Sequence, residues 1–486
     1  MNTNTQAQPI SRGARRAVLT YIGTAGVVIL LMMVLGFVMR LTQGKVLDVN
    51  LQYFYQIMTV HGTGMVGIVG LGSAAIMWYF LSQYVGLSIK VFLLNWVLFL
   101  IGVVMILGSV IFGHFAGAWT FLYPLPAHSM GQWSHTAAAF FLGGLTVIGV
   151  GFLVLHLDVA RAILVRYGSL GKALGWPQLF GQDTSEAPPP AVVASTMVLI
   201  INILGITSGA AILIMSLVNL FMPSFQINAL LAKNLIFFFG HVFINATIYM
   251  SVIGVYEILP RYARRPWKSS KWFLAAWNAS TVMVIIVYPH HLLMDFAMPT
   301  WMEIMGQIIS YLSGLPVLVV TAFGALTVVH RSGIRWDMAS GLMLLSAFGW
   351  AAGVVPAIID GTIRANEVLH NTLWVPGHFH FYLLLGVGSM LFGFMYFLGQ
   401  QEVQDHAVSP VDRIAFWAFA IGALGFVFTF LYEGSLSVPR RYGEHLSMWA
   451  GYDRIASLFI VLILVAVLVF VGRFFGRLIA PTRVNA

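Results

Sequence analysis

The sequence predicts an all-α membrane protein, a polytopic bundle of about twelve transmembrane helices. Of its 486 residues, 59% are hydrophobic and only 8% are charged, whereas a soluble domain carries about 25% charged residues. Twelve apolar runs in the chain each approach the ~20 residues that cross a bilayer as a helix. The basic residues fall mostly in alternate loops, and this asymmetry supports both the number of helices and their direction.

The elements follow from these runs in chain order. Residues 1–16 are polar and basic and lead directly into an apolar run, which predicts a short cytoplasmic tail and a retained first helix. Residues 158–193 are mostly polar and contain three consecutive prolines, so we expect a cytoplasmic linker there. The whole chain, 1–486, is expected to form a single membrane domain. The predicted helices are residues 17–40, 59–83, 91–113, 135–157, 194–221, 234–259, 272–288, 304–329, 339–360, 372–399, 412–433 and 455–478.

Lysine and arginine set the orientation, because they are enriched in cytoplasmic loops. With the N-terminus in the cytoplasm, eighteen of the 25 basic residues lie on the cytoplasmic side. This topology accounts for the net charge of +9 better than nucleic-acid binding does. The outer side holds Arg40, Lys45, Lys233, Arg364, Arg440, Arg441 and Arg454.

The chain contains no cysteine. Disulfides, iron–sulfur clusters and thiolate copper sites are therefore excluded within it. Any metal must be held by histidine, methionine, tyrosine or a carboxylate. The search for a metal site thus begins with the histidines.

Two histidines in the stretch HNTLWVPGHFHF, His378 and His380, lie two residues apart at the start of an apolar helix. Two helical residues correspond to about 200° of rotation, so the two imidazoles leave opposite faces. One helix can then hold a metal centre on each side. A haem iron with two histidines is closed to substrate, whereas one with a single histidine keeps a position open. His61, at the start of another apolar run, is a natural partner for one of the two.

Adjacent His290 and His291 follow Tyr288-Pro289 at the end of a predicted helix. Proline helps to end the helix, which lets both imidazoles face one ion. Imidazole is a good copper ligand, and a third one from His241 leaves an open coordination position for catalysis. The alternative is a solvated histidine pair in a loop. A single histidine in a membrane helix is more often a packing residue or a proton relay.

Two further features carry alternatives of their own. Five glycines after His61 would let a flat macrocycle approach the helix, or serve ordinary close helix packing. Arg440 and Arg441 lie on the outer side at the depth of the histidines, where they can bind carboxylates such as haem propionates. The alternative for the arginines is a snorkelling pair at the membrane interface. The glycines are Gly62, Gly64, Gly67, Gly70 and Gly72.

In combination, these motifs resemble the catalytic subunit I of the haem–copper oxidase superfamily over nearly the whole chain. The motifs are GH at 240–241, PHH at 289–291, HNTLWVPGHFH at 370–380 and PRRY at 439–442. With PTW at 299–301, they are similar to the B-type branch of oxygen reductases and its nitric oxide reductase relatives. The resemblance implies a twelve-helix fold, two haems and one copper ion.

The resemblance also implies which residues hold these groups. His61 and His380 are implied to bind the low-spin haem iron, and His378 the high-spin haem iron. His241, His290 and His291 are implied to bind copper opposite that iron. His370, Arg440 and Arg441 are implied to lie near the propionates.

A respiratory role in the plasma membrane of a bacterial or archaeal cell follows from the same resemblance. The donor is expected to be a cytochrome c or a cupredoxin. Its electrons are expected to enter through a subunit II-type partner with a soluble outer domain. That partner normally carries the copper-A centre, which agrees with the absence of cysteine here.

One departure from the family pattern bears on the substrate. In oxygen reductases of this branch, a tyrosine lies four residues after the first copper histidine and supplies an electron and a proton when the O–O bond breaks. This sequence has Asn245 at that position. Another branch carries the tyrosine about six residues before the paired histidines, where Val284 stands here. Tyr288 is nearby but not at that position, so a substitution by it is an alternative without further support in the sequence.

The substrate expectation therefore favours nitric oxide, because reducing two NO to N2O needs two electrons and no phenol. A hydrogen bond from Asn245 to a bound nitrosyl oxygen is a further hypothesis. The sparse polar residues of the run 304–329, which offer little path for cytoplasmic protons, agree with this choice. Cytochrome c oxidase activity, with O2 reduced to water and protons translocated, is the alternative. A secondary transporter with proton-relaying histidines is a remote alternative, but acidic residues are rare in the predicted spans.

Overall fold

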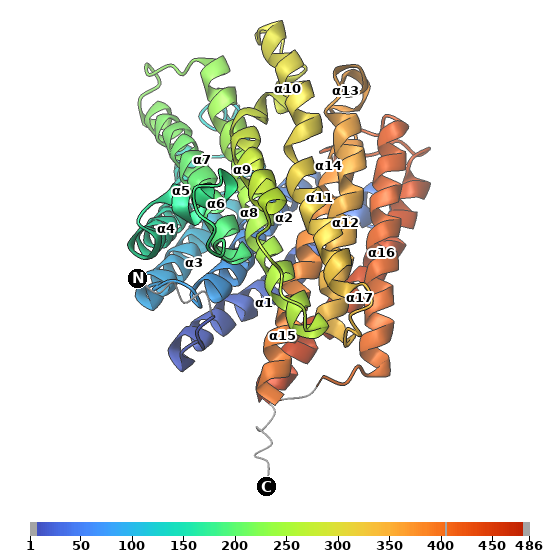
Figure 1. Cartoon of the computed structure of the whole chain (residues 1–486). Coiled ribbons are helices and arrows are strands. Elements are labelled where there is room, and N and C mark those ends of the chain that lie inside the picture. The colour runs from blue at the N-terminus through green and yellow to red at the C-terminus, as the bar shows by residue number, and fades with distance from the viewer. Residues whose placement is uncertain (1–6, 404–405, 480–486) are drawn as a thin grey trace.

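The computed structural model describes residues 7–403 and 406–479, and within them it contains helices and no strand. Twelve of its helical segments are long and apolar enough to cross a membrane. The prediction of an all-α bundle with twelve spans is confirmed. Long helices lie side by side through the bundle, with α10 and α13 at one end of it (Figure 1).

The helices differ in length and several are interrupted. The long ones are α1 (Arg12–Gln43), α2 (Leu51–Leu81), α3 (Ile89–Ile111), α4 (His135–Tyr167), α7 (Pro190–Phe221), α8 (Ala229–Ala263), α12 (Met338–Asp360), α16 (Pro410–Ser435) and α17 (Ala450–Ile479). The shorter ones are α5 (Leu170–Ala173), α6 (Trp176–Leu179), α9 (Lys271–Ile286), η1 (Tyr288–Leu292), α10 (Thr300–Ser313), α11 (Leu315–Val329), α13 (Ile363–Leu369), α14 (Trp374–His380), η2 (Phe381–Gly388) and α15 (Ser389–Val403).

Several helix ends extend beyond the predicted apolar runs. Helix α1 begins at Arg12, where the side chain of Ser11 accepts a hydrogen bond from the backbone of Ala14. Helix α2 begins at Leu51, where the side chain of Asn50 caps it. Side-chain caps satisfy the free N–H groups of the first helical turn. The helices can therefore begin with polar residues, which a prediction from hydropathy does not include in the span. Of the predicted tail, residues 1–6 lie outside the described part of the chain.

The segment 158–193 is more helical than the expected linker. Helix α4 continues through it to Tyr167, and α7 already begins at Pro190. Proline is compatible with a first helical turn because its missing N–H has no partner there anyway. Between these ends, α5 and α6 form two short turns of helix. Only the remaining residues connect the helices irregularly.

Two interruptions determine the shape of the site. Helix α9 ends at Ile286, and residues Tyr288–Leu292 form the 3₁₀ turn η1. Helix α14 passes directly into η2, a π-helical segment, before α15 completes the span. The π-helical geometry is rare and occurs often at functional sites, because it changes the direction in which side chains leave a helix. Both candidate metal-ligand motifs lie at such an interruption.

Buried residues from most of the long helices form one continuous hydrophobic core. Large side chains such as Trp78, Trp277 and Tyr249 are almost completely buried in it. Since lipid is as apolar as this core, close packing rather than exclusion from water associates the helices. The core therefore holds the helices in a fixed lateral arrangement around the cavity described below.

Candidate active site

One cavity of about 850 Å³ is lined by every residue predicted as a ligand or anion-binding group. Its wall draws on α2, α8, η1 and α14, together with the loops that flank α14 and α17. The structure therefore brings together residues more than 300 positions apart in the sequence. The lining includes His61, His241, Asn245, His290, His291, His370, His378, His380, Arg440 and Arg441.

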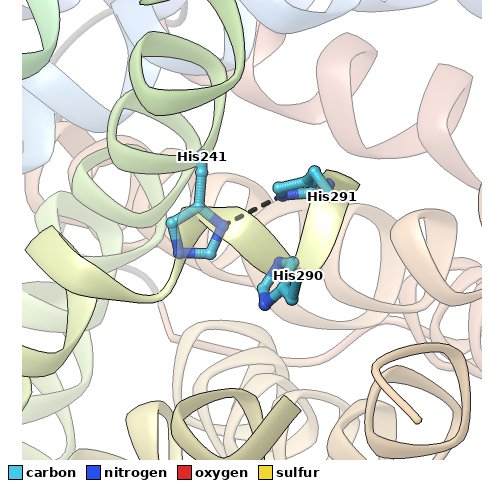
Figure 2. A group of neighbouring side chains, drawn as sticks. All are labelled: His241, His290 and His291. Atoms are coloured by element: carbon cyan, nitrogen blue, oxygen red, sulfur yellow. Dashed lines mark hydrogen bonds between the residues drawn. The ribbon is translucent and has the colours of Figure 1, made fainter. Parts of the chain in front are cut away.

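Three of these histidines, His241, His290 and His291, form what we call the three-His cluster (Figure 2). Each offers one nitrogen, and these nitrogens all lie within 4.8 Å of one another. The ring centroids of His290 and His291 are 4.3 Å apart, and that of His241 is 4.7 Å from His290. Both adjacent histidines lie in the 3₁₀ turn η1, which follows the end of α9.

Close backbone packing holds the turn η1 in place. Gly306 of α10 lies directly against it, and a Cβ atom at that position would be only 2.9 Å from the backbone nitrogen of His290. A side chain at residue 306 would therefore displace the turn. Glycine allows α10 to support the three-His cluster from behind.

The three-His cluster fits a metal ion chemically. The Nδ1 atom of His241 lies 3.1 Å from the Nε2 atom of His291, and the buried Nδ1 of His290 has no hydrogen-bond partner. Buried polar atoms without partners are costly, and a shared cation would satisfy converging imidazole lone pairs. Three imidazoles suit copper and leave a coordination position open.

Asn245 lies one turn of α8 beyond His241. Its side-chain nitrogen is 3.1 Å from His241 Nε2 and 2.9 Å from the backbone oxygen of His241. The amide therefore contacts the ring nitrogen of His241 that faces away from His291. A residue in this place orients the imidazole and influences how strongly it binds a metal.

His378 and His380 point to different sides of their helix, as their spacing predicts. His378 lies close enough to His290 and His291 to interact with them electrostatically. His380 instead packs edge-on against Phe426 and Phe430 of α16, with ring centroids 5.4 and 5.6 Å away. One side of α14 therefore belongs to the three-His cluster and the other side to a separate site.

His61 and His380 share a feature that is typical of metal-binding histidines. The Nδ1 of His61 is 2.7 Å from the backbone oxygen of Met32, and the Nδ1 of His380 is 2.7 Å from that of Pro376. Each carbonyl accepts the Nδ1–H proton, which leaves the lone pair on Nε2 free for a metal. Both rings line the cavity, so these two histidines would suit the binding of a haem iron.

The glycines after His61 mostly serve helix packing. A Cβ at Gly64 would be 2.2 Å from the sulfur of Met32, and one at Gly72 would be 2.7 Å from Leu391. Protein atoms therefore occupy the space beside them. Of the five, only Gly62 and Gly67 line the cavity, so the packing alternative holds for the others.

Arg440 and Arg441 are held beside the cavity by a short antiparallel bridge between Thr372 and Pro439. The backbone nitrogen of Arg440 donates to the Asn371 oxygen at 2.9 Å, and the Arg441 side chain donates to Thr120 Oγ1 at 2.9 Å. This bridge joins the PRRY segment to the segment that carries His378.

The basic side chains around Arg440 form a site that suits an anion. Burial and the neighbouring Arg441 lower the pKa of Arg440 to about 10, and burial together with Arg440 lowers the pKa of His370. For both groups, burial and the neighbouring arginine outweigh the opposite effect of the Asp360 carboxylate. The Nε atom of Arg440 is also buried without a partner. Carboxylates such as haem propionates would supply both the charge and the acceptor.

Sequence reasoning missed several residues of the cavity wall. Asp360, at the end of α12, places a carboxylate oxygen 3.7 Å from His378 Nε2. Thr120 belongs to a loop to which no role was assigned, and Arg40 was counted only as an outer-side charge. Charged residues are rare in the predicted spans, and those that do occur in a membrane usually face the interior of the bundle. This rule was the one signal that could have indicated Asp360 and Arg40.

The tyrosines that line the cavity do not include Tyr288. The hydroxyl of Tyr288 donates to Asn234 at 2.8 Å, and Tyr288 does not contribute to the cavity wall. Tyr249, Tyr311 and Tyr382 do line it. Tyr249 lies one turn of α8 beyond Asn245. It is therefore a better candidate than Tyr288 for a phenol that supplies an electron at this site.

The fold and the site together define a polytopic membrane protein with an internal cavity lined by histidines. The chain belongs to the family described as cytochrome c and quinol oxidase polypeptide I, whose model matches residues 16–485. This family is one of oxidoreductases. The predicted membership in the haem–copper oxidases is confirmed, and the transporter alternative is not favoured.

Similar proteins agree with this assignment. Cytochrome c oxidase subunit 1 of Cereibacter sphaeroides is 23% identical over 272 residues, which are 55% of this chain and 47% of that protein. A putative cytochrome c oxidase subunit 1-beta of Streptomyces avermitilis is 23% identical over 425 residues, covering 81% and 69%. Cytochrome c oxidase polypeptide 1 of Halobacterium salinarum is 22% identical over 358 residues, covering 72% and 57%. The match thus spans about half the length of the first of these relatives.

A solved structure has the same fold. It is a heme–copper terminal oxidase dimer determined by cryo-electron microscopy, with a TM-score of 0.82 and 19% sequence identity. The superposition covers 97% of this chain and 85% of that one. At this identity the likeness establishes the fold alone.

Proposed function

We propose that this protein is the catalytic subunit of a respiratory haem–copper terminal reductase. The observation that carries the proposal is the meeting of the six proposed ligand histidines around one cavity, three of them in the three-His cluster. His61 and His380 hold a low-spin haem, His378 holds a high-spin haem, and the three-His cluster holds copper. When bound, these groups supply the electron transfer that reduces a diatomic gas.

We infer that the gas is nitric oxide. The balanced reaction, 2 NO + 2 e⁻ + 2 H⁺ → N2O + H2O, requires no phenol. Asn245 occupies the position one turn from His241 and cannot be oxidised as a tyrosine can. Among the buried residues of α11, Thr321 alone is polar, and its hydroxyl contacts that of Tyr256 at 2.5 Å. These two hydroxyl groups form only a short polar path for protons. Such a path agrees with NO reduction, which consumes two protons, whereas O2 reduction consumes four.

In this reaction, the residues of the chain orient the ligand histidines, bind the haem propionates and admit the gas. Asn245 fixes the ring of His241, and the Met32 and Pro376 carbonyls fix the rings of His61 and His380. Arg440 and Arg441 anchor the haem propionates. The apolar part of the cavity wall admits an uncharged gas and excludes ions.

Reduction of O2 to water is the second candidate, O2 + 4 e⁻ + 4 H⁺ → 2 H2O. A specific observation favours it: Tyr249 lines the cavity one turn beyond Asn245. Its ring lies 5.3 Å from that of Trp277 and 6.0 Å from that of Trp350, centroid to centroid. Such a cluster of oxidisable rings can donate an electron in place of the missing tyrosine.

The location and partners follow from the proposed activity. The protein spans the plasma membrane of a bacterial or archaeal cell with its N-terminus in the cytoplasm. A subunit II-type partner with a soluble outer domain transfers electrons from a cytochrome c or a cupredoxin. The twelve spans and the family membership support this arrangement.

The decisive experiment is anaerobic turnover of the purified, reduced complex with NO, beside oxygen uptake with the same donor. We expect rapid N2O formation and slow oxygen uptake. Rapid, complete reduction of O2 to water would reject NO as the substrate and support the second candidate. A protein that binds neither haem nor copper would contradict the proposal as a whole.

A further inference from the structure

A second group of buried ionisable side chains lies beside the low-spin haem site. It consists of Arg40 from α1, Glu433 from α16, Asp453 from α17 and His445 from the loop between the last two helices. We call these four residues the buried ionic cluster. Their side chains are 4% exposed for Arg40 and 0% exposed for the other three.

Short contacts connect the members. Arg40 Nη2 lies 2.7 Å from Glu433 Oε2 and 2.5 Å from Asp453 Oδ1. His445 Nδ1 lies 3.0 Å from Asp453 Oδ2. The other terminal nitrogen of Arg40 donates to Gln43 at 2.9 Å. A single guanidinium therefore serves two carboxylates, and an imidazole faces one of them.

The charges of the cluster do not cancel. With His445 neutral, two carboxylates and one guanidinium leave one negative charge that is shielded from solvent. The other basic groups nearby make their hydrogen bonds outside the cluster: Lys45 donates to Ser447, and Arg454 donates from Nε to the Gly44 oxygen. Because an uncompensated buried charge is costly, such a site binds a proton instead.

Two atoms of the cluster have no partner. His445 Nε2 and Arg40 Nε are buried and make no hydrogen bond within the described residues. One ring nitrogen of His445 therefore has no contact with a polar group of the described chain. His445 also lies in a loop next to the exposed residues Glu444 and Leu446, so the route from the cluster to the surface is short.

The cluster is electrostatically connected to the proposed haem ligands. Arg40 lines the cavity together with His61 and His380. Its Cζ atom lies 4.6 Å from the ring centroid of Phe430, and that ring is 5.6 Å from the ring of His380. Charges interact strongly over such distances inside a membrane protein, because little water is present to screen them.

We propose that the buried ionic cluster is a binding site for one exchangeable proton, which it takes up when the low-spin haem is reduced. The electron added to the haem makes the region more negative, so the cluster binds H⁺ from the nearby surface more tightly. Oxidation of the haem reverses this and releases the proton. The proposal rests on the proposed function, since it takes His61 and His380 to hold that haem.

By linkage, the pH must then affect the haem. The midpoint potential of the low-spin haem should fall as the pH rises, because the deprotonated cluster repels the electron. Glu433→Gln and Asp453→Asn each leave one guanidinium and one carboxylate, which are neutral without a bound proton. Either variant should therefore match the wild type at low pH and show a higher potential at high pH.

The test is an anaerobic redox titration of the purified full-length complex, followed at the low-spin haem absorbance, between about pH 6 and pH 9. We expect each variant to reduce the pH dependence of the potential at least about two-fold. Glu257→Gln is the matched control, because Glu257 is another buried carboxylate, bonded to Tyr84 and paired with Arg261 away from this cluster. It should keep the wild-type pH dependence.

A wild-type potential that is independent of pH would overturn the proposal, as would an unchanged pH dependence in both variants. The haem spectrum of each sample shows whether the protein is folded and loaded. Absence of a low-spin haem signal in the wild type would instead contradict the proposed function, so the two failures are distinguishable.

Discussion

The side-chain nitrogen of Asn245 lies 3.1 Å from Nε2 of His241, one turn earlier on α8. Asn245, which stands where the resemblance implies a tyrosine, thus contacts a proposed copper ligand directly. Its amide can orient the imidazole but cannot supply an electron. This contact connects the metal site with the choice between NO and O2.

Asn245→Ala should lower NO reduction by roughly 10- to 100-fold, the usual effect of removing a residue that orients a metal ligand. The copper content should fall in parallel, measured by elemental analysis on protein with an intact haem spectrum. Full activity with full copper would show that Asn245 does not orient His241. Asn245→Tyr should raise the ratio of O2 uptake to N2O formation.

His290→Ala should abolish copper binding, because two imidazoles cannot replace the three nitrogens that meet within 4.8 Å. The low-spin haem spectrum should be unchanged, since His290 does not contact its ligands. His135→Ala, at the first residue of α4, is a control that should keep one copper per chain. Retention of copper in His290→Ala would contradict the proposed ligand set.

His378→Ala and His380→Ala should remove different haem signals. His380 packs against Phe426 and Phe430 on one side of α14, whereas His378 interacts with His290 and His291 on the other. We expect His380→Ala to lose the low-spin spectrum and His378→Ala to lose carbon monoxide binding at the high-spin haem. Loss of the same signal in both variants would refute the assignment to two sites.

Tyr249→Phe tests the second candidate function. If Tyr249 supplies an electron for O2 reduction, the variant should reduce O2 at least about ten times more slowly, and NO turnover should be unchanged. Tyr288→Phe is the comparison, because its hydroxyl donates to Asn234 outside the cavity wall. Equal O2 uptake by Tyr249→Phe and wild type would exclude Tyr249 from this role.

Gly306→Ala should disturb the three-His cluster from behind. The new methyl group would meet the His290 backbone nitrogen at 2.9 Å, and overpacking of this kind costs about 1–3 kcal/mol. We expect a lower melting temperature and weaker copper binding. Gly314→Ala should change neither, because the added carbon would meet no atom within 4 Å apart from its chain neighbours and the local helix backbone. Equal copper affinity in the two variants would show that η1 can shift freely.

Much of the fold could be predicted because its signals are local. A stretch of about 20 apolar residues specifies a membrane span wherever it packs, and basic loops specify direction. The opposite directions of His378 and His380 follow from helical rotation alone. Helix ends were predicted less well, since caps such as Ser11 and Asn50 are polar and hydropathy excludes them.

The lateral arrangement could not be predicted in the same way. In a membrane, a face that contacts lipid and a face that contacts another helix are equally apolar, so hydropathy does not show which side chains point inward. Tyr249 and Tyr288 therefore look equivalent in the sequence, although one lines the cavity and the other bonds to Asn234. Arg40, Glu433 and Asp453 likewise appear as separate charges near helix ends.

The amino-acid pattern alone was thus enough for the class of the protein, the number of spans and the histidines proposed as ligands. Packing in three dimensions decided which groups meet: the three-His cluster, the contact of Asn245 with His241, and the buried ionic cluster. The reason is physical. Hydropathy and helical periodicity depend on neighbours in the chain, whereas metal binding and charge compensation depend on atoms brought together from distant helices.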